Sequence, residues 1–260
     1  MIQNDRNFDD LTERFARNIY GNAKGEVRLA IVWEHLLQTL PQLTAGTPLR
    51  ILDAGCGLGQ MALKLAELGH EVVLSDTSEN MIAASRKLFE QQLPENIPQL
   101  IHAPVQKLYA DSLGQFDLVL FHAVLEWLAE PKQTLKHLLS LIQPEGSLSL
   151  MFYNRDALVF RNLIRGNWRK AESNDLQGEE GGLTPYHPLS LEEVQGWMDE
   201  WQFDLLSRAG VRVIYDYMDR KMREARPTEE VVRIEMKYAR QEPYLHMGRY
   251  LHLICRKQSK

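Results

Sequence analysis

The sequence predicts an α/β fold built on a doubly wound, mostly parallel sheet. Between residues 50 and 153, five short apolar segments alternate with helical patterns. The first of these segments runs directly into a glycine-rich turn, and the second ends at an acidic residue. The chain has 260 residues, 44% of them hydrophobic and 25% charged, which suits one globular domain with a modest insertion.

The predicted core begins after two helical patterns, over residues 8–20 and 25–40. Within the core, Ser78 is a suitable N-cap for the helix that follows the second strand. The predicted strands are 50–54, 71–75, 100–105, 116–121 and 147–153. The predicted helices are 61–68, 79–92 and 132–142, the last of them closed by Pro144.

The pattern changes after Asn154. A helix is predicted over 157–168, a loop or lid over the polar stretch 173–182, and a second helix over 191–201. Strand-like segments at 203–209 and 211–217, a helix at 228–238 and a strand at 250–256 complete the chain. We therefore divide one domain, 1–260, into N-terminal helices (1–45), a cofactor-binding core (50–154), an insertion (155–202) and C-terminal strands with a helix (203–260).

Composition argues against a membrane or exported protein. No stretch approaches the ~18 uncharged apolar residues of a membrane span, and the first ten residues are polar and acidic rather than a signal peptide. Cys56 and Cys255 stand in different predicted elements without metal-ligand spacing, so neither a disulfide nor a metal site is expected. We expect a cytoplasmic protein without bound metal.

The charge is unevenly distributed along the chain. A net charge of -5 argues against indiscriminate nucleic-acid binding, yet residues 205–260 carry +6 and leave -11 for the first 204 residues. A second basic cluster, opposed only by Asp156, consists of Arg155, Arg161, Arg165, Arg169 and Lys170. Such clusters are often ordinary solvated faces, and contact with an anionic partner is the alternative explanation.

Three glycines follow the first strand: Gly55, Gly57 and Gly59. Without side chains there, a ligand can approach the backbone amides, and the N-terminus of the next helix favours negative or polar groups. The spacing is G-x-G-x-G, whereas the dinucleotide fingerprint G-x-G-x-x-G would place its third glycine at Gln60. Because a tight strand-to-helix turn needs glycine anyway, the loop alone does not identify the ligand.

Asp76 ends the second strand about 20 residues after the loop, where a carboxylate can accept hydrogen bonds from both hydroxyls of a ribose. An Asx turn before the Ser78 helix is the structural alternative. Asp53, which leads the loop, can hold the loop or receive an amino group of the cofactor. An NAD-dependent dehydrogenase would use the same acid, but the glycine spacing and Asp53 favour a different nucleoside cofactor.

Three motifs in residues 50–153 resemble those of class I methyltransferases: DAGCGLGQ, LSDTS and FDLVLFHAVLEW. The resemblance implies a seven-stranded Rossmann-like sheet that binds S-adenosyl-L-methionine. It also implies that Val105 and Gln106 flank the adenine and that His122 faces the methyl group. A histidine satisfied within an apolar segment is the structural alternative for His122.

Strings along nearly the whole chain are similar to a bacterial family that methylates 5-carboxymethoxyuridine at the wobble position of tRNA. They are RNFDDLTERFARNIYGNAKGEVRLAIVW, FHAVLEW, LSLMFYN, GVRVIYDYM and RQEPYLHMGRYLHL. The resemblance and the glycine loop together imply a set of cofactor-binding residues. They are Arg28, Asp53, Gly55, Cys56, Gly57, Gly59, Asp76, Val105, Gln106 and His122. Cys56 stands where some relatives carry glycine, a change that the neighbouring glycines should tolerate.

The resemblance implies methyl transfer to the carboxylate of 5-carboxymethoxyuridine at position 34 of tRNA, giving the methyl ester and S-adenosylhomocysteine. A carboxylate is already ionised at neutral pH, so no general base is expected. We assign Arg28 to the cofactor, and the candidates for holding the substrate carboxylate are Tyr20, Arg212, Tyr215, Tyr217 and Arg249. Tyr215 and Tyr217 would share one strand face and are equally consistent with core aromatics.

An anticodon stem-loop also needs phosphate contacts and a surface on which an extruded base can stack. Arg161, Arg165, Trp168 and Arg169 are our candidates, together with the basic C-terminal segment. The alternative functions are a small-molecule carboxyl or O-methyltransferase, a non-catalytic protein that binds S-adenosylmethionine and, third, an NAD-dependent dehydrogenase.

Overall fold

The computed structural model describes residues 5–7, 9, 22–173, 176 and 185–259. The helix predicted over 8–20 and the polar stretch predicted over 173–182 lie almost entirely outside these residues. No helix within the described ranges is both long enough and apolar enough to cross a membrane.

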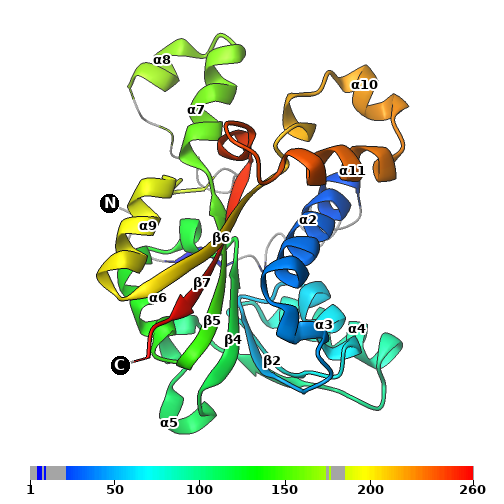
Figure 1. Ribbon diagram of the computed structural model, residues 1–260, viewed down its shortest axis with the longest axis vertical. Helices are drawn as coiled ribbons and strands as arrows, with labels where there is room; N and C mark the ends of the chain where they lie inside the picture. Colours follow the sequence, from blue (N-terminus) through cyan, green and yellow to red (C-terminus); the bar gives the residue numbers. More distant parts are fainter. Residues whose placement is uncertain (1–4, 8, 10–21, 174–175, 177–184, 260) are drawn as a thin grey trace.

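The described chain forms one seven-stranded sheet with helices on both faces (Figure 1). The strands are β1 (Arg50–Ala54), β2 (Glu71–Asp76), β3 (Gln99–His102), β4 (Phe116–His122), β5 (Ile142–Tyr153), β6 (Phe203–Val211) and β7 (Tyr250–Lys257). Their order is β3-β2-β1-β4-β5-β7-β6, and only β7 runs antiparallel to its neighbours. The doubly wound, mostly parallel sheet predicted from the sequence is thereby confirmed.

Ten α-helices are seen in the described residues. They are α2 (Ala23–Thr39), α3 (Gln60–Glu67), α4 (Glu79–Gln92), α5 (Ala110–Leu113), α6 (Pro131–Leu139), α7 (Arg155–Ile164), α8 (Trp168–Glu172), α9 (Leu191–Glu200), α10 (Arg220–Ala225) and α11 (Thr228–Tyr238). Helix α4 begins where predicted, because the Ser78 hydroxyl accepts a hydrogen bond from the Met81 N–H at 3.1 Å. Helices α5 and α10 were not predicted.

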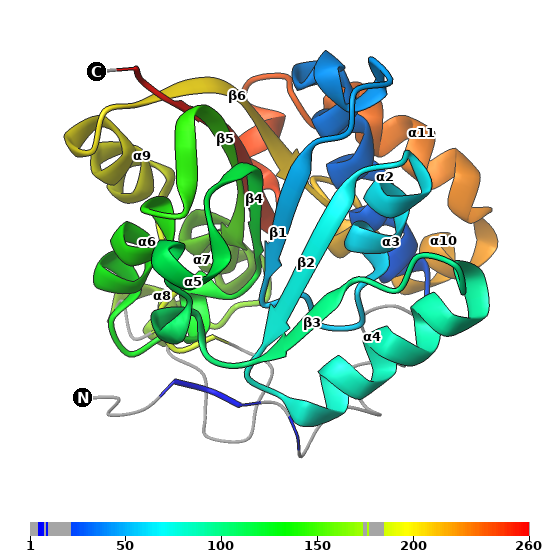
Figure 2. The same ribbon diagram turned by 90° about the horizontal axis from the view of Figure 1, so that it is seen from below.

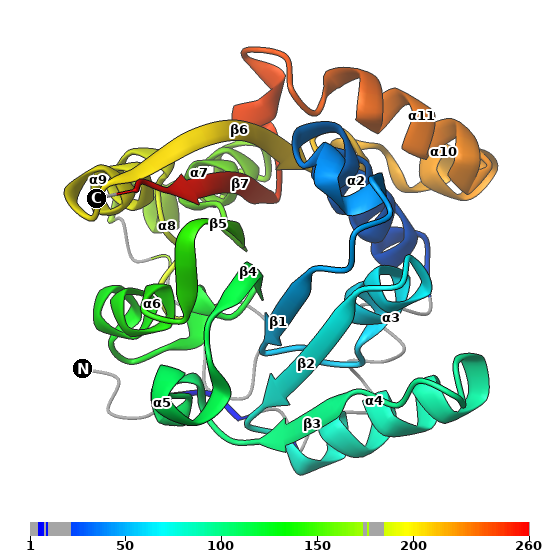
Figure 3. The same cartoon turned by 60° about the horizontal axis from the view of Figure 1, so that its bottom comes forward.

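Two apolar cores fill the two faces of the sheet. In β1, Leu52 packs into the core beneath α6 and α9, while its neighbour Ile51 packs into the core beneath α2, α3 and α4. This alternation follows from the two-residue period of a strand, and the helices lie on opposite sides of the sheet (Figures 2 and 3). Burying one such side chain contributes about 1.5–3 kcal/mol, so the central strands form a rigid platform.

Two elements of the core end at residues other than those predicted from the sequence. Strand β3 stops at His102 rather than at residue 105, because its partner β2 ends opposite it at Asp76 and Pro104 follows. The helix predicted over 132–142 ends at Leu139, and Pro144 does not close it. Pro144 lies near the start of β5, in an interruption of the pairing with β4, where a proline is tolerated.

Two predictions after residue 154 also need correction. The single helix predicted over 157–168 is two helices, α7 and α8, separated by Gly166 with a positive φ of 74°. The strand predicted over 211–217 does not form. Strand β6 stops at Val211, Arg212 takes a φ of 60°, and a 3₁₀ turn covers Tyr215–Tyr217.

The sheet topology determines where a ligand can bind. Strand order reverses between β1 and β4, and open α/β sheets bind ligands outside the carboxyl ends of the strands at such a point. Helices α7, α8 and α10 extend beyond that edge of the sheet (Figure 1).

Candidate cofactor and substrate site

The glycine loop between β1 and α3 is tightly constrained. Gly55, Gly57 and Gly59 all have positive φ values, 73°, 55° and 73°. A Cβ on Gly55 would come within 2.3 Å of a Val124 methyl group, so no side chain fits there. Gly59 caps α3, and its Cβ would lie 3.0 Å from the Ser85 hydroxyl. The first glycine keeps the cleft open, while the third lets α3 pack closely.

Asp76 forms the Asx turn that the sequence offered as the structural alternative, and it also holds the glycine loop. One carboxylate oxygen accepts the Gly57 N–H at 2.9 Å, and the other accepts the Ser78 N–H at 2.9 Å in an Asx turn. Burial raises the pKa of Asp76, and these backbone hydrogen bonds oppose the shift. Because each oxygen can accept more than one hydrogen bond, Asp76 retains capacity for ribose hydroxyls.

The loop and Asp76 line a cleft at the carboxyl ends of β1 and β4, where open α/β sheets bind ligands. The predicted cofactor residues that line it are Arg28, Gly55, Gly57, Asp76, Val105, Gln106 and His122. An adjoining cleft shares Arg28, Gly55 and His122 and adds Asp53 and Cys56. Gly59 lines neither cleft, so the structure brings nine of the ten predicted residues together.

Two buried groups at the loop have shifted pKa values. Burial raises the pKa of Asp53 to about 7, and the negative charge of Asp76 adds to the shift. A cation bound beside Asp53 would favour its ionised form. Burial also raises the pKa of the Cys56 thiol well above its ordinary value, so this cysteine is no nucleophile.

His122 ends a buried hydrogen-bond chain that sequence reasoning did not identify. Its Nε2 lies 2.8 Å from the Ser149 hydroxyl, which lies 2.7 Å from Nε2 of His252. His252 meets His35 at 2.9 Å, and His35 meets Ser207 at 2.8 Å. Burial lowers the pKa of His122 to about 3, with a further contribution from the charge of Arg28. The histidine at the cleft is therefore neutral and fixed in orientation.

Residues before the first helix close the cleft, and no motif signalled this. Both carboxylate oxygens of Asp5 are used, one by the Ala129 N–H at 2.8 Å and one by the Gln106 amide at 2.7 Å. The Arg6 N–H donates to the Trp127 carbonyl at 3.1 Å. The buried Oε1 of Gln106, a residue of the cleft wall, has no hydrogen-bond partner, so this acceptor is available.

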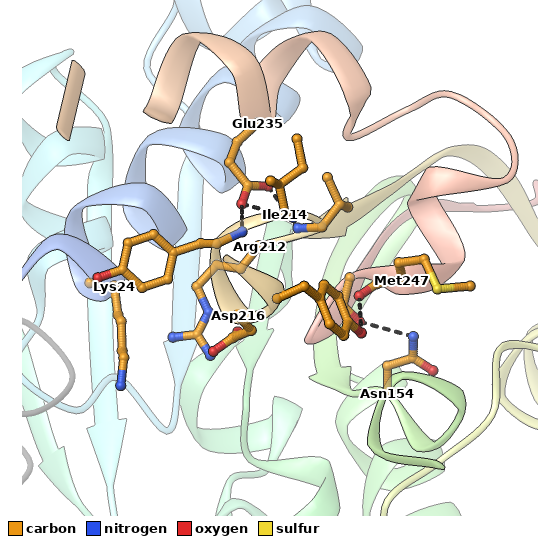
Figure 4. Close-up of polar contacts among 12 residues, drawn as sticks. Lys24, Asn154, Arg212, Ile214, Asp216, Glu235 and Met247 are labelled. Atoms are coloured by element: carbon orange, nitrogen blue, oxygen red, sulfur yellow. Dashed lines mark hydrogen bonds and ion pairs between the residues drawn. The ribbon is translucent and has the colours of Figure 1, made fainter. Parts of the chain in front are cut away.

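The candidates for the substrate carboxylate have separate environments. Tyr20 lies outside the described residues. Arg212 pairs with Asp216 at 2.9 Å, and both side chains are only 9% exposed (Figure 4). The Tyr217 hydroxyl donates to the Met247 carbonyl at 2.8 Å.

The remaining two candidates, Tyr215 and Arg249, each lie beside a different side chain. Tyr215 lies below the Arg223 guanidinium, 5.6 Å from it, and the Arg249 guanidinium lies 4.8 Å above the Tyr153 ring. Tyr215 and Tyr217 do not share a strand face, because the Glu235 carboxylate accepts the backbone N–H groups of residues 213 to 215. Those bonds replace strand pairing.

The predicted contacts for tRNA lie on α7 and α8. Arg165 and Arg169 are exposed, while Arg161 is partly buried. The Trp168 side chain is 64% exposed although its indole N–H donates to the Leu163 carbonyl at 3.1 Å. Exposed aromatic and basic side chains on one arm fit a nucleic-acid surface. No metal-binding group of three or more His, Cys, Asp or Glu occurs in the part of the chain described.

Comparisons with known proteins agree with this geometry. A family model described as a methyltransferase domain matches residues 52–150. The tRNA 5-carboxymethoxyuridine methyltransferase of Escherichia coli (strain K12) is 41% identical over 257 residues, covering 98% of this chain and 98% of that protein. A ubiquinone biosynthesis O-methyltransferase of Acinetobacter baumannii (strain AYE) is 30% identical, over only 45% of this chain and 49% of its own.

Two solved structures share the fold. A magnesium protoporphyrin IX methyltransferase from Synechocystis PCC 6803, with bound S-adenosylmethionine, has a TM-score of 0.63 at 16% identity and covers 96% and 93% of the two chains. A 1,6-didemethyltoxoflavin-N1-methyltransferase from Burkholderia thailandensis has a TM-score of 0.58 at 16% identity and covers 97% and 86%. At this level of identity, both carry information about the fold alone.

Proposed function

The chain belongs to the family of tRNA 5-carboxymethoxyuridine methyltransferases, and we propose that it methylates the carboxylate of 5-carboxymethoxyuridine at the wobble position of tRNA. The observation that carries the proposal is the match to the Escherichia coli enzyme, which extends over 98% of both chains rather than over the cofactor-binding core alone. A tRNA substrate would place the protein in the cytoplasm.

The cofactor is S-adenosylmethionine, which supplies a methyl group on a positively charged sulfur when bound. The residues of the cleft fit it. Gly55 and Gly57 leave room against the backbone, Asp76 can accept ribose hydroxyls, and the unpartnered Oε1 of Gln106 can accept the adenine amino group. Arg28 would hold the carboxylate of the cofactor and Asp53 its ammonium group.

The remaining assigned residues would act by position. Val105 is buried in the wall of the cleft beside Gln106, where an apolar side chain can pack on one face of the adenine. Cys56 contributes a small side chain, and Gly59 the turn into α3. His122, at the end of β4, would face the reacting methyl group.

The reaction requires positioning rather than acid or base catalysis. One oxygen of the substrate carboxylate attacks the methyl carbon while the carbon–sulfur bond breaks, and the electron pair of that bond remains on sulfur. No proton moves, so a neutral His122 is suitable. Opposite charges neutralise along this path, and an enclosed cleft that excludes water favours such a step.

The arm formed by α7 and α8 would bind the anticodon stem-loop through Arg161, Arg165, Trp168 and Arg169. Figure 1 shows this arm on one side of the carboxyl edge of the sheet and the basic helix α10 on the other. Phosphates would contact the exposed Arg165 and Arg169, and a base would stack on the indole. This surface favours tRNA over a small-molecule carboxylic acid, which is the second candidate substrate.

Transfer of labelled methyl groups from S-adenosylmethionine tests the proposal. The acceptors are tRNA carrying 5-carboxymethoxyuridine, the same tRNA with unmodified uridine at position 34, and free small carboxylic acids. We expect label in the first alone. Label only in small acids would identify a small-molecule methyltransferase, and cofactor binding without label in any acceptor would identify a non-catalytic binding protein.

A further inference from the structure

A group of cations lies at the carboxyl edge of the sheet, next to the cofactor cleft. Lys24 lies in the first turn of α2, and Arg212 follows β6; Figure 4 shows Asp216 beside Arg212. Arg249 precedes β7 and influences Lys24 electrostatically. Burial lowers the pKa of Lys24; the charge of Asp216 opposes the shift, and the charges of the nearby arginines add to it. These groups therefore share one electrostatic site.

Arg161 belongs to the same group. Burial lowers the pKa of Arg161, and the charge of Arg249 lowers it further. The buried Nε of Arg161 has no hydrogen-bond partner. A buried guanidinium N–H without an acceptor is unfavourable, so a ligand that brings an acceptor would be stabilised there.

One acid, Asp216, lies among these cations and offsets part of their positive charge. Asp216 is paired with Arg212, and the Glu235 carboxylate is occupied by three backbone N–H groups (Figure 4). Lys24, Arg161 and Arg249 make no ion pair with an acidic side chain among the residues that the structure describes. Arg212 differs from these three cations in having an acidic partner.

Aromatic rings hold the free guanidinium in place. Arg249 lies 4.8 Å over the Tyr153 ring, and Tyr153 meets Tyr250 edge-on at 5.5 Å. Tyr217, whose hydroxyl is anchored at Met247, meets an exposed phenylalanine of α7 edge-on at 5.4 Å. A planar guanidinium held on a ring can present two parallel N–H groups to a carboxylate.

The group lies close to the cofactor cleft along one strand and one helix. Tyr153 is two residues beyond Met151, which lines the cofactor cleft and pairs with His122, a distance of about 7 Å along the strand. Lys24 precedes Arg28 by one turn of α2, about 6 Å along the helix. A carboxylate held by one oxygen at this group would direct its other oxygen toward the cleft.

We propose that Arg161 and Arg249 form the site that binds the carboxylate of the substrate, with Tyr153 orienting Arg249 and Lys24 adding positive charge. The proposal rests on the proposed function and identifies the residues that recognise the modified base. An oxyanion here has two possible sources, the carboxylate of the base or a phosphate of the tRNA. Because the group adjoins the cleft wall at Met151, the structure favours the carboxylate.

The test compares Arg249→Gln and Arg161→Gln with the wild type and with Arg86→Gln, a control that removes an exposed arginine of α4. For each protein, the affinity for tRNA carrying 5-carboxymethoxyuridine is measured against that for the same tRNA with unmodified uridine. Cofactor affinity and kcat/KM are measured alongside. The conservative Arg249→Lys variant keeps the positive charge and loses the two parallel N–H groups of the guanidinium.

We expect both glutamine variants to lose about 10- to 100-fold in kcat/KM. Their preference for the modified tRNA should fall to nearly one, with cofactor affinity and affinity for unmodified tRNA unchanged. Arg249→Lys should recover part of the preference, and Arg86→Gln should match the wild type.

Equal losses for both tRNAs would assign the cations to a phosphate, and an unchanged preference would remove them from recognition altogether; either result overturns the inference. If Arg249→Gln fails to bind the cofactor, Arg161→Gln carries the test alone. A wild type that methylates neither tRNA would instead contradict the proposed function, so the two failures are distinguishable.

Discussion

His35 and His252 face each other through their Nδ1 atoms, 2.9 Å apart in the buried core. Only one of the two nitrogens can carry the hydrogen when both rings are neutral, so the rings must be opposite tautomers. Burial lowers the pKa of His35 to about 3 and that of His252 well below its ordinary value, which keeps the pair neutral. The Ser149 hydroxyl lies between His252 and His122, so the tautomers of the pair determine the tautomer of His122 at the cleft.

Imidazole nitrogen spectra should show one Nδ1–H ring and one Nε2–H ring for His35 and His252, both still neutral at pH 5. The Ser149 hydroxyl has one hydrogen, so where it donates to one neighbouring histidine it accepts from the other. His122 should then share the tautomer of His35. Two identical tautomers for His35 and His252, or protonation of either at pH 5, would contradict the chain.

Glu126 should make the protein less stable as pH rises. Burial raises the pKa of Glu126 to about 8, far above its value in an unfolded chain, with hydrogen bonds and Arg28 opposing the shift. Between these two pKa values the folded state holds a proton that the unfolded state has lost, so stability falls with increasing pH.

The Glu126→Gln variant has no carboxyl group at this position, so its unfolding releases no proton there. Urea unfolding at pH 5.5 and 7.5 should show the variant gaining up to about 1.4 kcal/mol per pH unit over the wild type. Glu90→Gln, at an exposed position of α4, supplies the background change. A constant difference between Glu126→Gln and the wild type across this range would show that Glu126 is ionised in the folded protein.

Gly55→Ala should weaken cofactor binding for a steric reason. At a φ of 73°, the new methyl group would lie 2.3 Å from Val124, which lines the cleft. Gly46→Ala is the matched control, since Gly46 has a φ of 82° and open space around it.

Both alanine variants should lose roughly 1–2 kcal/mol of stability from the left-handed backbone. Only Gly55→Ala should also lose about tenfold or more in cofactor affinity, measured by calorimetry at a temperature where both are folded. Equal cofactor affinities in the two variants would mean that the loop does not approach the ligand.

Reversing charge on the α7–α8 arm should weaken tRNA binding and reduce its salt dependence. Each phosphate contact releases counterions, so the double variant Arg165→Glu, Arg169→Glu should lower the slope of log affinity against log salt by about two. Arg86→Glu on α4 is the control, and cofactor affinity should stay unchanged in both. An unaltered tRNA affinity would remove the arm from the binding surface.

The core elements could be predicted because their signals are local. The strand 50–54 and the helix 79–92 have the predicted bounds, since an apolar run before glycines and a serine cap leave few alternatives. The same applies to Asp76, whose place at a strand end follows from sequence spacing. Nine of the ten predicted cofactor residues consequently line the two clefts.

Features that depend on distant contacts could not be predicted. Glu235 takes the N–H groups that would have continued β6, so Tyr215 and Tyr217 leave the predicted strand. His35 and His252 are 217 positions apart, and Asp5 and Gln106 are 101 apart. No local pattern signals such pairs, because side-chain meetings of this kind depend on the packing of the whole sheet.

Nucleoside mass analysis of tRNA bearing 5-carboxymethoxyuridine, after incubation with the purified protein and S-adenosylmethionine, tests the central claim most directly. We predict that the modified wobble nucleoside gains the mass of one methyl group and loses it again in mild alkali, as an ester does. An unchanged nucleoside in the presence of bound cofactor, or a gain that survives alkali, would contradict carboxyl methylation by this protein.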